Sequence, residues 1–96
     1  MAELRLTPAA VQDLENIWRY TAQRWSISQA ERYIDRLSTC FEALAQAPLS
    51  APACDHIRPG YRRQSIESHM VYFLVREDVV TVVRVLHERM DAPRHL

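Results

Sequence analysis

The amino-acid sequence predicts an α+β fold in which a two-helix hairpin packs on one face of a small sheet. Residues 8–47 carry apolar side chains at spacings of three and four, the period of amphipathic helices. Residues 61–87 are instead rich in β-branched and aromatic side chains and are divided by short polar turns. A chain of 96 residues with 48% hydrophobic content is sized for one domain, residues 1–96, with one core.

The N-terminal residues Glu3 to Leu6 are expected to form a short strand that leads into the first helix. Thr7 and Pro8 mark the start of that helix, because threonine caps a first turn well and proline suits the first helical position. The helix should bury one face, which consists of Leu14, Ile17, Trp18, Thr21 and Trp25.

The segment Arg24-Trp25-Ser26 breaks the first helix, and a second helix follows at once. Its capping box is either Ser26 with Gln29 or Ser28 with Glu31, and the sequence does not choose between them. So short a connection predicts an antiparallel hairpin that ends before Pro48. The buried stripe of the second helix is expected to be Ala30, Tyr33, Ile34, Leu37, Phe41, Leu44 and Ala45, and the aromatic residues Trp18, Tyr33 and Phe41 are expected in the core.

The second half of the chain predicts a three-stranded antiparallel meander. Residues 48–56 form a loop with two prolines, and Pro59-Gly60 makes a turn. The strands are expected at residues 61–66, 69–75 and 79–87, joined by turns at 67–68 and 76–78. The N-terminal strand adds a fourth, and the helical hairpin covers one face of the sheet.

The strand at 79–87 should lie inside the sheet, because its apolar residues occupy both faces. A regular alternation places Val79, Val83 and Val85 on one side and Val80, Val82 and Leu86 on the other. Arg84 interrupts this run, and His87, Glu88 and Arg89 follow where it ends. The end of the strand is therefore expected to belong to a functional surface.

Composition excludes several classes of protein. The chain carries twelve basic residues, all of them Arg, and twelve acidic ones. Residues 1–55 contain five Arg and seven acidic residues, a net charge of −2, and residues 56–96 contain seven Arg and five acidic residues, a net charge of +2. This asymmetry is too small for a protein that works mainly on nucleic acid. Cys40 and Cys54 lack metal-type spacing and are expected as free thiols in a reduced compartment. The expectations are therefore a cytoplasmic protein without membrane segment, metal or cofactor.

Five motifs in order resemble the ParE branch of the ParE/RelE superfamily of bacterial type II toxins. They are R-P-G-Y-R-R at 58–63, S-H-M-V-Y-F at 68–73, R-V-L-H at 84–87, M-D-x-x-R-H-L at 90–96, and the stretch joining the helices with Trp25 and Gln29-Ala30. The resemblance implies a RelE/ParE-like fold and a toxin held silent by a cognate ParD-like antitoxin in a hetero-oligomer. It implies poisoning of DNA gyrase for the ParE branch and ribosome-dependent mRNA cleavage for the RelE branch.

Site chemistry has to choose between these activities, because one fold hosts both. An RNA-cleaving site would use His87 as acid or base, with Arg84 and either Arg62 or Arg63 on the phosphate. Arg84 and His87 are three residues apart, so a regular strand points them to opposite faces, and no glycine marks a bulge that would change this. The prediction is a gyrase inhibitor without catalytic residues. A nuclease and an inert partner-binding relative are the alternatives.

The residues expected to contact the antitoxin or the target are Arg58, Tyr61, Arg62, Arg63, Arg84, His87, Arg89, Met90 and Arg94. Open sheet edges would accept a strand of the antitoxin, and the helical hairpin would accept an amphipathic helix. Several of these residues could instead have a purely structural role or lie on solvated surface. Arg84 could pair with Glu88 or Glu67, and His87 could be a hydrogen-bonded structural histidine. Met90 and Leu96 could bury a tail that docks on the domain.

Overall fold

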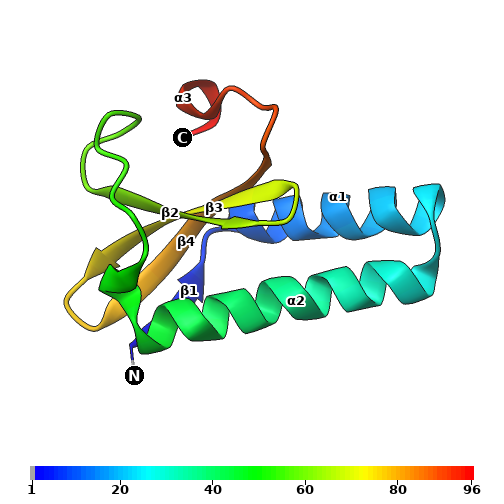
Figure 1. Ribbon diagram of the computed structural model, residues 1–96, viewed down its shortest axis with the longest axis horizontal. Coiled ribbons are helices and arrows are strands. Elements are labelled where there is room, and N and C mark those ends of the chain that lie inside the picture. The colour runs from blue at the N-terminus through cyan, green and yellow to red at the C-terminus, as the bar shows by residue number, and fades with distance from the viewer. Residues whose placement is uncertain (1) are drawn as a thin grey trace.

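The computed structural model describes residues 2–96 and contains a mixed four-stranded sheet with a helical hairpin on one face (Figure 1). Its elements are, in chain order, β1 (Glu3–Leu6), α1 (Pro8–Arg24), α2 (Ile27–Gln46), the 3₁₀ helix η1 (Pro48–Ser50), β2 (Tyr61–Ile66), β3 (His69–Arg76), β4 (Val79–His87) and α3 (Ala92–His95). The α+β prediction is confirmed, and β2 and β4 have the predicted bounds.

The two caps of the hairpin are threonine and serine hydroxyls. Thr7 caps α1 by accepting from the Ala10 N–H at 3.0 Å, with Pro8 at the first helical position, as predicted. Ser26 caps α2 by accepting from the Gln29 N–H at 3.0 Å, which decides the choice that the sequence left open.

The sheet order is β1-β4-β3-β2, so β4 has a neighbour on both sides, as its two apolar faces predicted. Strands β2, β3 and β4 form the expected antiparallel meander. Strand β1 instead runs parallel to β4, pairing Leu6 with Val82. This parallel pair is possible because the whole helical hairpin separates the two strands in sequence.

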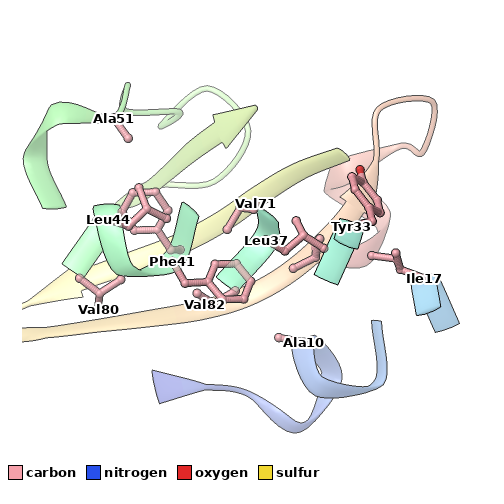
Figure 2. Packing of buried hydrophobic residues seen from close by; sticks show 12 residues of the cluster. Ala10, Ile17, Tyr33, Leu37, Phe41, Leu44, Ala51, Val71, Val80 and Val82 are labelled. Atoms are coloured by element: carbon pink, nitrogen blue, oxygen red, sulfur yellow. The ribbon is translucent and has the colours of Figure 1, made fainter. Parts of the chain in front are cut away.

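The main core lies between the hairpin and the sheet (Figure 2). The predicted stripe of α2 is confirmed, and Tyr33 and Phe41 are buried. The expectation for Trp18 was wrong: its side chain is exposed, and so is that of Trp25. The buried face of α1 is formed by Ala10, Asp13 and Ile17, a stripe rotated away from the aromatic residues.

A β-bulge in β4 changes which of its valines share a face. Phe73 pairs with Val82 and Tyr72 with Arg84, so Val83 is the extra residue. Val85 therefore joins Val80 and Val82 in the main core, and the predicted grouping of Val85 with Val79 and Val83 was wrong. The bulge contains no glycine, so its usual sequence marker was absent.

A second, smaller cluster covers the opposite face of the sheet. It contains Cys54, Tyr72, Leu86 and Ala92, with Leu96 packed against it. The tail docks on the domain through α3, as expected. Ala92 and Leu96 make this contact, whereas Met90, which was expected to be buried with Leu96, is 40% exposed. Both cysteines are free thiols, and burial raises the pKa of each.

The outer edge of β2 is partly covered, which limits the expected strand addition. Arg63 donates its N–H to the Pro52 carbonyl at 3.1 Å, and Ala53 forms a bridge with Arg62. The uncovered part of this edge begins at Gln64. Across residues 2–96, no helix combines the length and the apolar character needed to cross a membrane.

Candidate functional site

A hollow of about 810 Å³ opens between the helical hairpin, one end of the β3–β4 pair and the tail. Its volume is in the range of ligand-binding clefts. Its wall mixes aromatic, cationic and amide side chains. The lining residues are Asp13, Asn16, Ile17, Tyr20, Thr21, Trp25, Gln29, Arg32, Tyr33, Arg36, Glu67, Ser68, His69, Arg84, Val85, His87, Met90 and His95.

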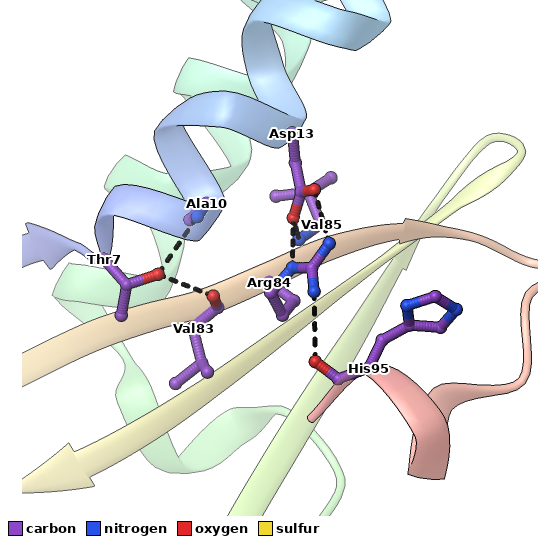
Figure 3. Close-up of polar contacts among 7 residues, drawn as sticks. All are labelled: Thr7, Ala10, Asp13, Val83, Arg84, Val85 and His95. Carbon is purple, nitrogen blue, oxygen red and sulfur yellow. Dashed lines mark hydrogen bonds and ion pairs between the residues drawn. The ribbon is translucent and has the colours of Figure 1, made fainter.

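The floor of this hollow is a bidentate ion pair between Arg84 and Asp13 (Figure 3). The Arg84 Nε and Nη2 atoms donate to the two carboxylate oxygens at 2.7 Å each. The hydrogen bond with Asp13 raises the pKa of Arg84 despite partial burial. Arg84 Nη1 also donates to the His95 carbonyl at 3.1 Å. The expected pairing of Arg84 with Glu88 or Glu67 was wrong, because α1 brings a closer carboxylate from 71 positions away.

Helix α1 replaces β1 as the neighbour of β4 beyond Leu6. The Thr7 N–H donates to the Val82 carbonyl at 3.0 Å, and its hydroxyl donates to the Val83 carbonyl at 2.7 Å. The Val85 N–H donates to Asp13 at 2.9 Å (Figure 3). The polar groups that the bulge turns toward α1 are therefore satisfied by the helix start.

Three titratable side chains meet on the other side of the hollow. The Tyr33 hydroxyl and His69 Nδ1 lie 2.5 Å apart, and the His69 ring meets His87 edge to face at 5.4 Å between centroids. Burial lowers the pKa of His69, and His87 adds to this effect. Burial raises the pKa of Tyr33, so its hydroxyl stays protonated and can donate to a neutral His69.

Opposite parity places Arg84 and His87 on opposite faces of β4, as predicted, since Arg84 pairs with Tyr72 and His87 with His69. Both nevertheless line the hollow. The separation expected from parity therefore does not hold at this end of β4, because β1 stops at Leu6 and the long Arg84 side chain reaches Asp13 on α1. His87 Nδ1 accepts a hydrogen bond from the Arg89 N–H at 3.1 Å, as expected if His87 is a structural histidine.

The other predicted contact residues are not gathered with His87. Arg62 donates to the Ala51 carbonyl at 2.7 Å, and Arg63 shares the face of Tyr72. Arg58 lies over the Tyr61 ring and donates to the Leu96 carbonyl. Arg89 and Arg94 are exposed, and only Met90 joins Arg84 and His87 at the hollow.

Sequence reasoning missed Asp13, Tyr33 and His69 as site residues. Asp13 had a signal: it lies three residues after Ala10 and four before Ile17, so it shares their buried face and needs a cationic partner. His69 had none. Without the bulge, His69 would pair with Leu86, and only the one-residue shift places it opposite His87.

The arrangement is better suited to binding than to acid–base chemistry. Arg84 is the lining arginine nearest His87 in sequence, and each of its three nitrogens donates a hydrogen bond to Asp13 or His95. Arg36 is paired with Glu67, whereas Arg32, the remaining lining arginine, has no ion pair within residues 2–96 and donates to the Ser28 hydroxyl. Among residues 2–96, no three His, Cys, Asp or Glu side chains are placed to hold a metal.

Comparisons with known proteins identify toxins of one family as relatives of this chain. The family model described as "ParE toxin of type II toxin-antitoxin system, parDE" matches residues 4–92. Toxin ParE1 of Mycobacterium tuberculosis (strain ATCC 25618 / H37Rv) is 47% identical over 92 residues, 95% of this chain and 94% of the relative. Toxin ParE1 of Caulobacter vibrioides is 38% identical over 96 residues, 100% of this chain and 99% of the relative.

A solved structure supports the fold. The "Chromosomal ParDE TA system from P. aeruginosa" includes a chain that superposes with a TM-score of 0.81, over 91% of this chain and 96% of that one. At 19% identity, this likeness bears on the fold alone.

Proposed function

This chain belongs to the ParE toxin family of type II toxin–antitoxin systems, and we propose that it arrests growth by inhibiting DNA gyrase. A cognate ParD-like antitoxin keeps it silent in the cytoplasm as a hetero-oligomer. The gyrase target rests on the resemblance to the ParE branch. The choice of inhibition over catalysis rests on the chemistry of the hollow.

The observation that carries this choice is the ion pair between Arg84 and Asp13. An RNA-cleaving site needs a cation that is free to meet a phosphate beside the acid or base. Arg84 has its Nε and Nη2 atoms on Asp13 and its Nη1 on His95, while Arg62 is held by the Ala51 carbonyl. These bonds favour a protein that acts by binding another protein over one that acts by acid–base catalysis.

The activity test combines expression without antitoxin and an assay with purified proteins. Induction is expected to cause filamentation and a DNA-damage response, and the purified protein is expected to block supercoiling by DNA gyrase. Co-expression of the cognate antitoxin should restore growth. Harmless expression would instead identify an inert partner-binding relative.

The second candidate function is the ribosome-dependent nuclease, which one observation favours: His87, His69 and Tyr33 lie together at the same hollow as Arg84. The measurement that decides is mRNA integrity on translating ribosomes. Cleaved message with unimpaired gyrase would replace the proposed function, and a His87→Ala variant should then lose cleavage while keeping antitoxin affinity.

Antitoxin binding is proposed to use the exposed and half-exposed arginines among the predicted contact residues, a set that does not include Arg76. The side chains of Arg63 and Arg89 have no ion pair within residues 2–96, so they are available to carboxylates of the antitoxin. The Arg63→Glu, Arg89→Glu double variant should bind antitoxin at least about tenfold more weakly, with a smaller dependence on salt. Arg76→Glu, at the far turn, is the matched control. Equal affinity for both variants would contradict this assignment.

A further inference from the structure

The connected ends of α1 and α2 form a projection that the core does not require. The helices have 17 and 20 residues, about 25 and 30 Å at 1.5 Å per residue, and their joined ends lie beyond the sheet (Figure 1). The last buried residue of α1 is Ile17, and the first of α2 is Ala30. Residues 18–29 are all exposed or half-exposed.

This projection, residues 18–32 with the buried Ala30 at its base, carries most of the large apolar side chains that the domain leaves in water. Trp18 is 37% exposed, Tyr20 66%, Trp25 65% and Ile27 59%. Elsewhere in residues 2–96 the exposed large apolar side chains are Val11, Leu49 and Met90, of which Met90 lines the hollow together with Tyr20 and Trp25. Single exposed apolar residues are ordinary, but Tyr20 and Trp25 line one hollow, and exposed aromatic side chains on a shared surface mark an interaction site.

The charge of the projection selects the partner. Residues 18–32 contain Arg19, Arg24 and Arg32 against Glu31, and none of the three arginines has an ion pair within residues 2–96. The Arg24 guanidinium lies over the Trp25 ring at 5.9 Å. Aromatic and arginine side chains together are the composition of interface hot spots.

We propose that the projection at residues 18–32 is the surface with which this toxin grips its target, a folded protein that offers an apolar pocket rimmed by carboxylates. Trp25 and Ile27 enter the pocket, and Arg19 and Arg24 meet the carboxylates at its rim. The assignment rests on the proposed function, in which the toxin acts on a protein. It assigns Arg63 and Arg89 to the antitoxin, whose amphipathic helix would contact the hairpin outside residues 18–32.

The test compares two variants of the projection with a control of equal exposure. The Trp25→Ala, Ile27→Ala double variant removes the apolar contact, and Arg24→Glu reverses the charge. The control is Leu49→Ala, because Leu49 is 68% exposed in η1, outside the projection. Each protein is measured for growth arrest on expression, inhibition of purified gyrase, affinity for the antitoxin, and sedimentation. Circular dichroism checks that every variant folds.

Both projection variants should require at least about tenfold more protein for half-inhibition of gyrase, with antitoxin affinity and sedimentation unchanged. Inhibition equal to that of wild type and Leu49→Ala would overturn the inference and leave the gyrase assignment intact. A wild-type dimer that the double variant dissociates would assign the surface to a second copy instead. Loss of antitoxin binding with full toxicity would likewise overturn the inference.

If the wild-type protein arrests growth without touching gyrase, the proposed target fails. The projection is then judged by growth arrest alone, with the same tenfold expectation. Harmless expression of the wild-type protein would overturn both the inference and the proposed function.

Discussion

Asp13 is the residue that joins the two halves of this chain. Its carboxylate accepts three hydrogen bonds, two from the Arg84 guanidinium and one from the Val85 N–H, and its own side chain is only 10% exposed. Removing one member of such a buried pair leaves the other charge without its partner in a poorly solvated place. Asp13 is therefore a requirement of the fold as well as the floor of the hollow.

The Asp13→Asn variant should lower the free energy of unfolding by about 2–4 kcal/mol, because an amide cannot offer the Arg84 fork two anionic oxygens. Urea denaturation measures the change. The control is Asp91→Asn, which removes an exposed pair with Arg94 and should cost less than about 0.5 kcal/mol. Similar costs for both variants would show that the buried pair has no special role.

His69 should make stability depend on pH. Its pKa in the fold is lowered below the ordinary value of 6.5 by burial and then by His87, with Glu88, Asp13 and Glu67 acting in the opposite direction. Between these two pKa values the unfolded chain binds more protons than the folded one, so stability falls as pH decreases below about 6.5. Above 6.5 the contribution of His69 is fully present.

Denaturation at a series of pH values between 7.5 and 5 tests this. The wild-type protein should lose stability toward acid, and the His69→Gln variant should lose part of that dependence. His95→Gln is the control, because His95 also lines the hollow but lies in the tail and is exposed. An unchanged pH profile in His69→Gln would contradict the assignment.

At the scale of elements, the start of α1 and the bulge of β4 depend on each other. The Thr7 hydroxyl accepts from Ala10 and donates to the Val83 carbonyl, so one side chain caps the helix and satisfies the bulge. Ser26 caps α2 in the same way but bonds nothing in the sheet. The two caps should therefore differ in their contribution to stability.

Replacing Thr7 by Ala should cost about 2 kcal/mol, the upper end for an N-cap, because the Val83 carbonyl also loses its partner. Ser26→Ala should cost about 0.5–1 kcal/mol. Thermal or urea denaturation compares them, and Thr7→Ser, which keeps the hydroxyl, should stay close to the wild type. A larger loss in Ser26→Ala than in Thr7→Ala would refute the double role.

At the scale of the whole molecule, the sheet is covered by two layers of unequal extent. The hairpin covers one face with the main core, while the other face carries the small cluster of Cys54, Tyr72, Leu86 and Ala92. Short segments with few buried contacts open locally at low cost. The tail is such a segment, and it also supplies the His95 carbonyl to Arg84.

Ala92→Asp should therefore release the tail without unfolding the domain, because Ala92 is only 7% exposed and a carboxylate there would be poorly solvated. Hydrogen exchange should become faster in residues 90–96 and in the loop at 51–60, while α2 and β3 keep their protection. Pro93→Ala, at an exposed neighbour, is the control. Loss of protection throughout the sheet would mean that the tail is part of the cooperative core.

The helices and strands of this protein could be predicted from its sequence, because their signals are local. Thr7-Pro8, the break at residues 24–26 and the predicted turns at 67–68 and 76–78 set the elements to within a residue or two. The stripe of α2 determined the main core, and five motifs in order determined the family. Each signal depends on residues a few positions apart, where spacing and side-chain chemistry decide the outcome.

The tertiary structure decided what depends on residues far apart in the chain. The bulge at Val83 exists because α1 offers the Thr7 hydroxyl and the Asp13 carboxylate to backbone groups more than 70 positions away. That one-residue shift sets His69 against His87 and moves Val85 into the core. Trp18 is exposed because the buried face of α1 runs through Ala10, Asp13 and Ile17, and Trp25 is exposed because the joined ends of the helices lie beyond the sheet. The spacing of apolar residues within a helix does not indicate how far the sheet beside it extends.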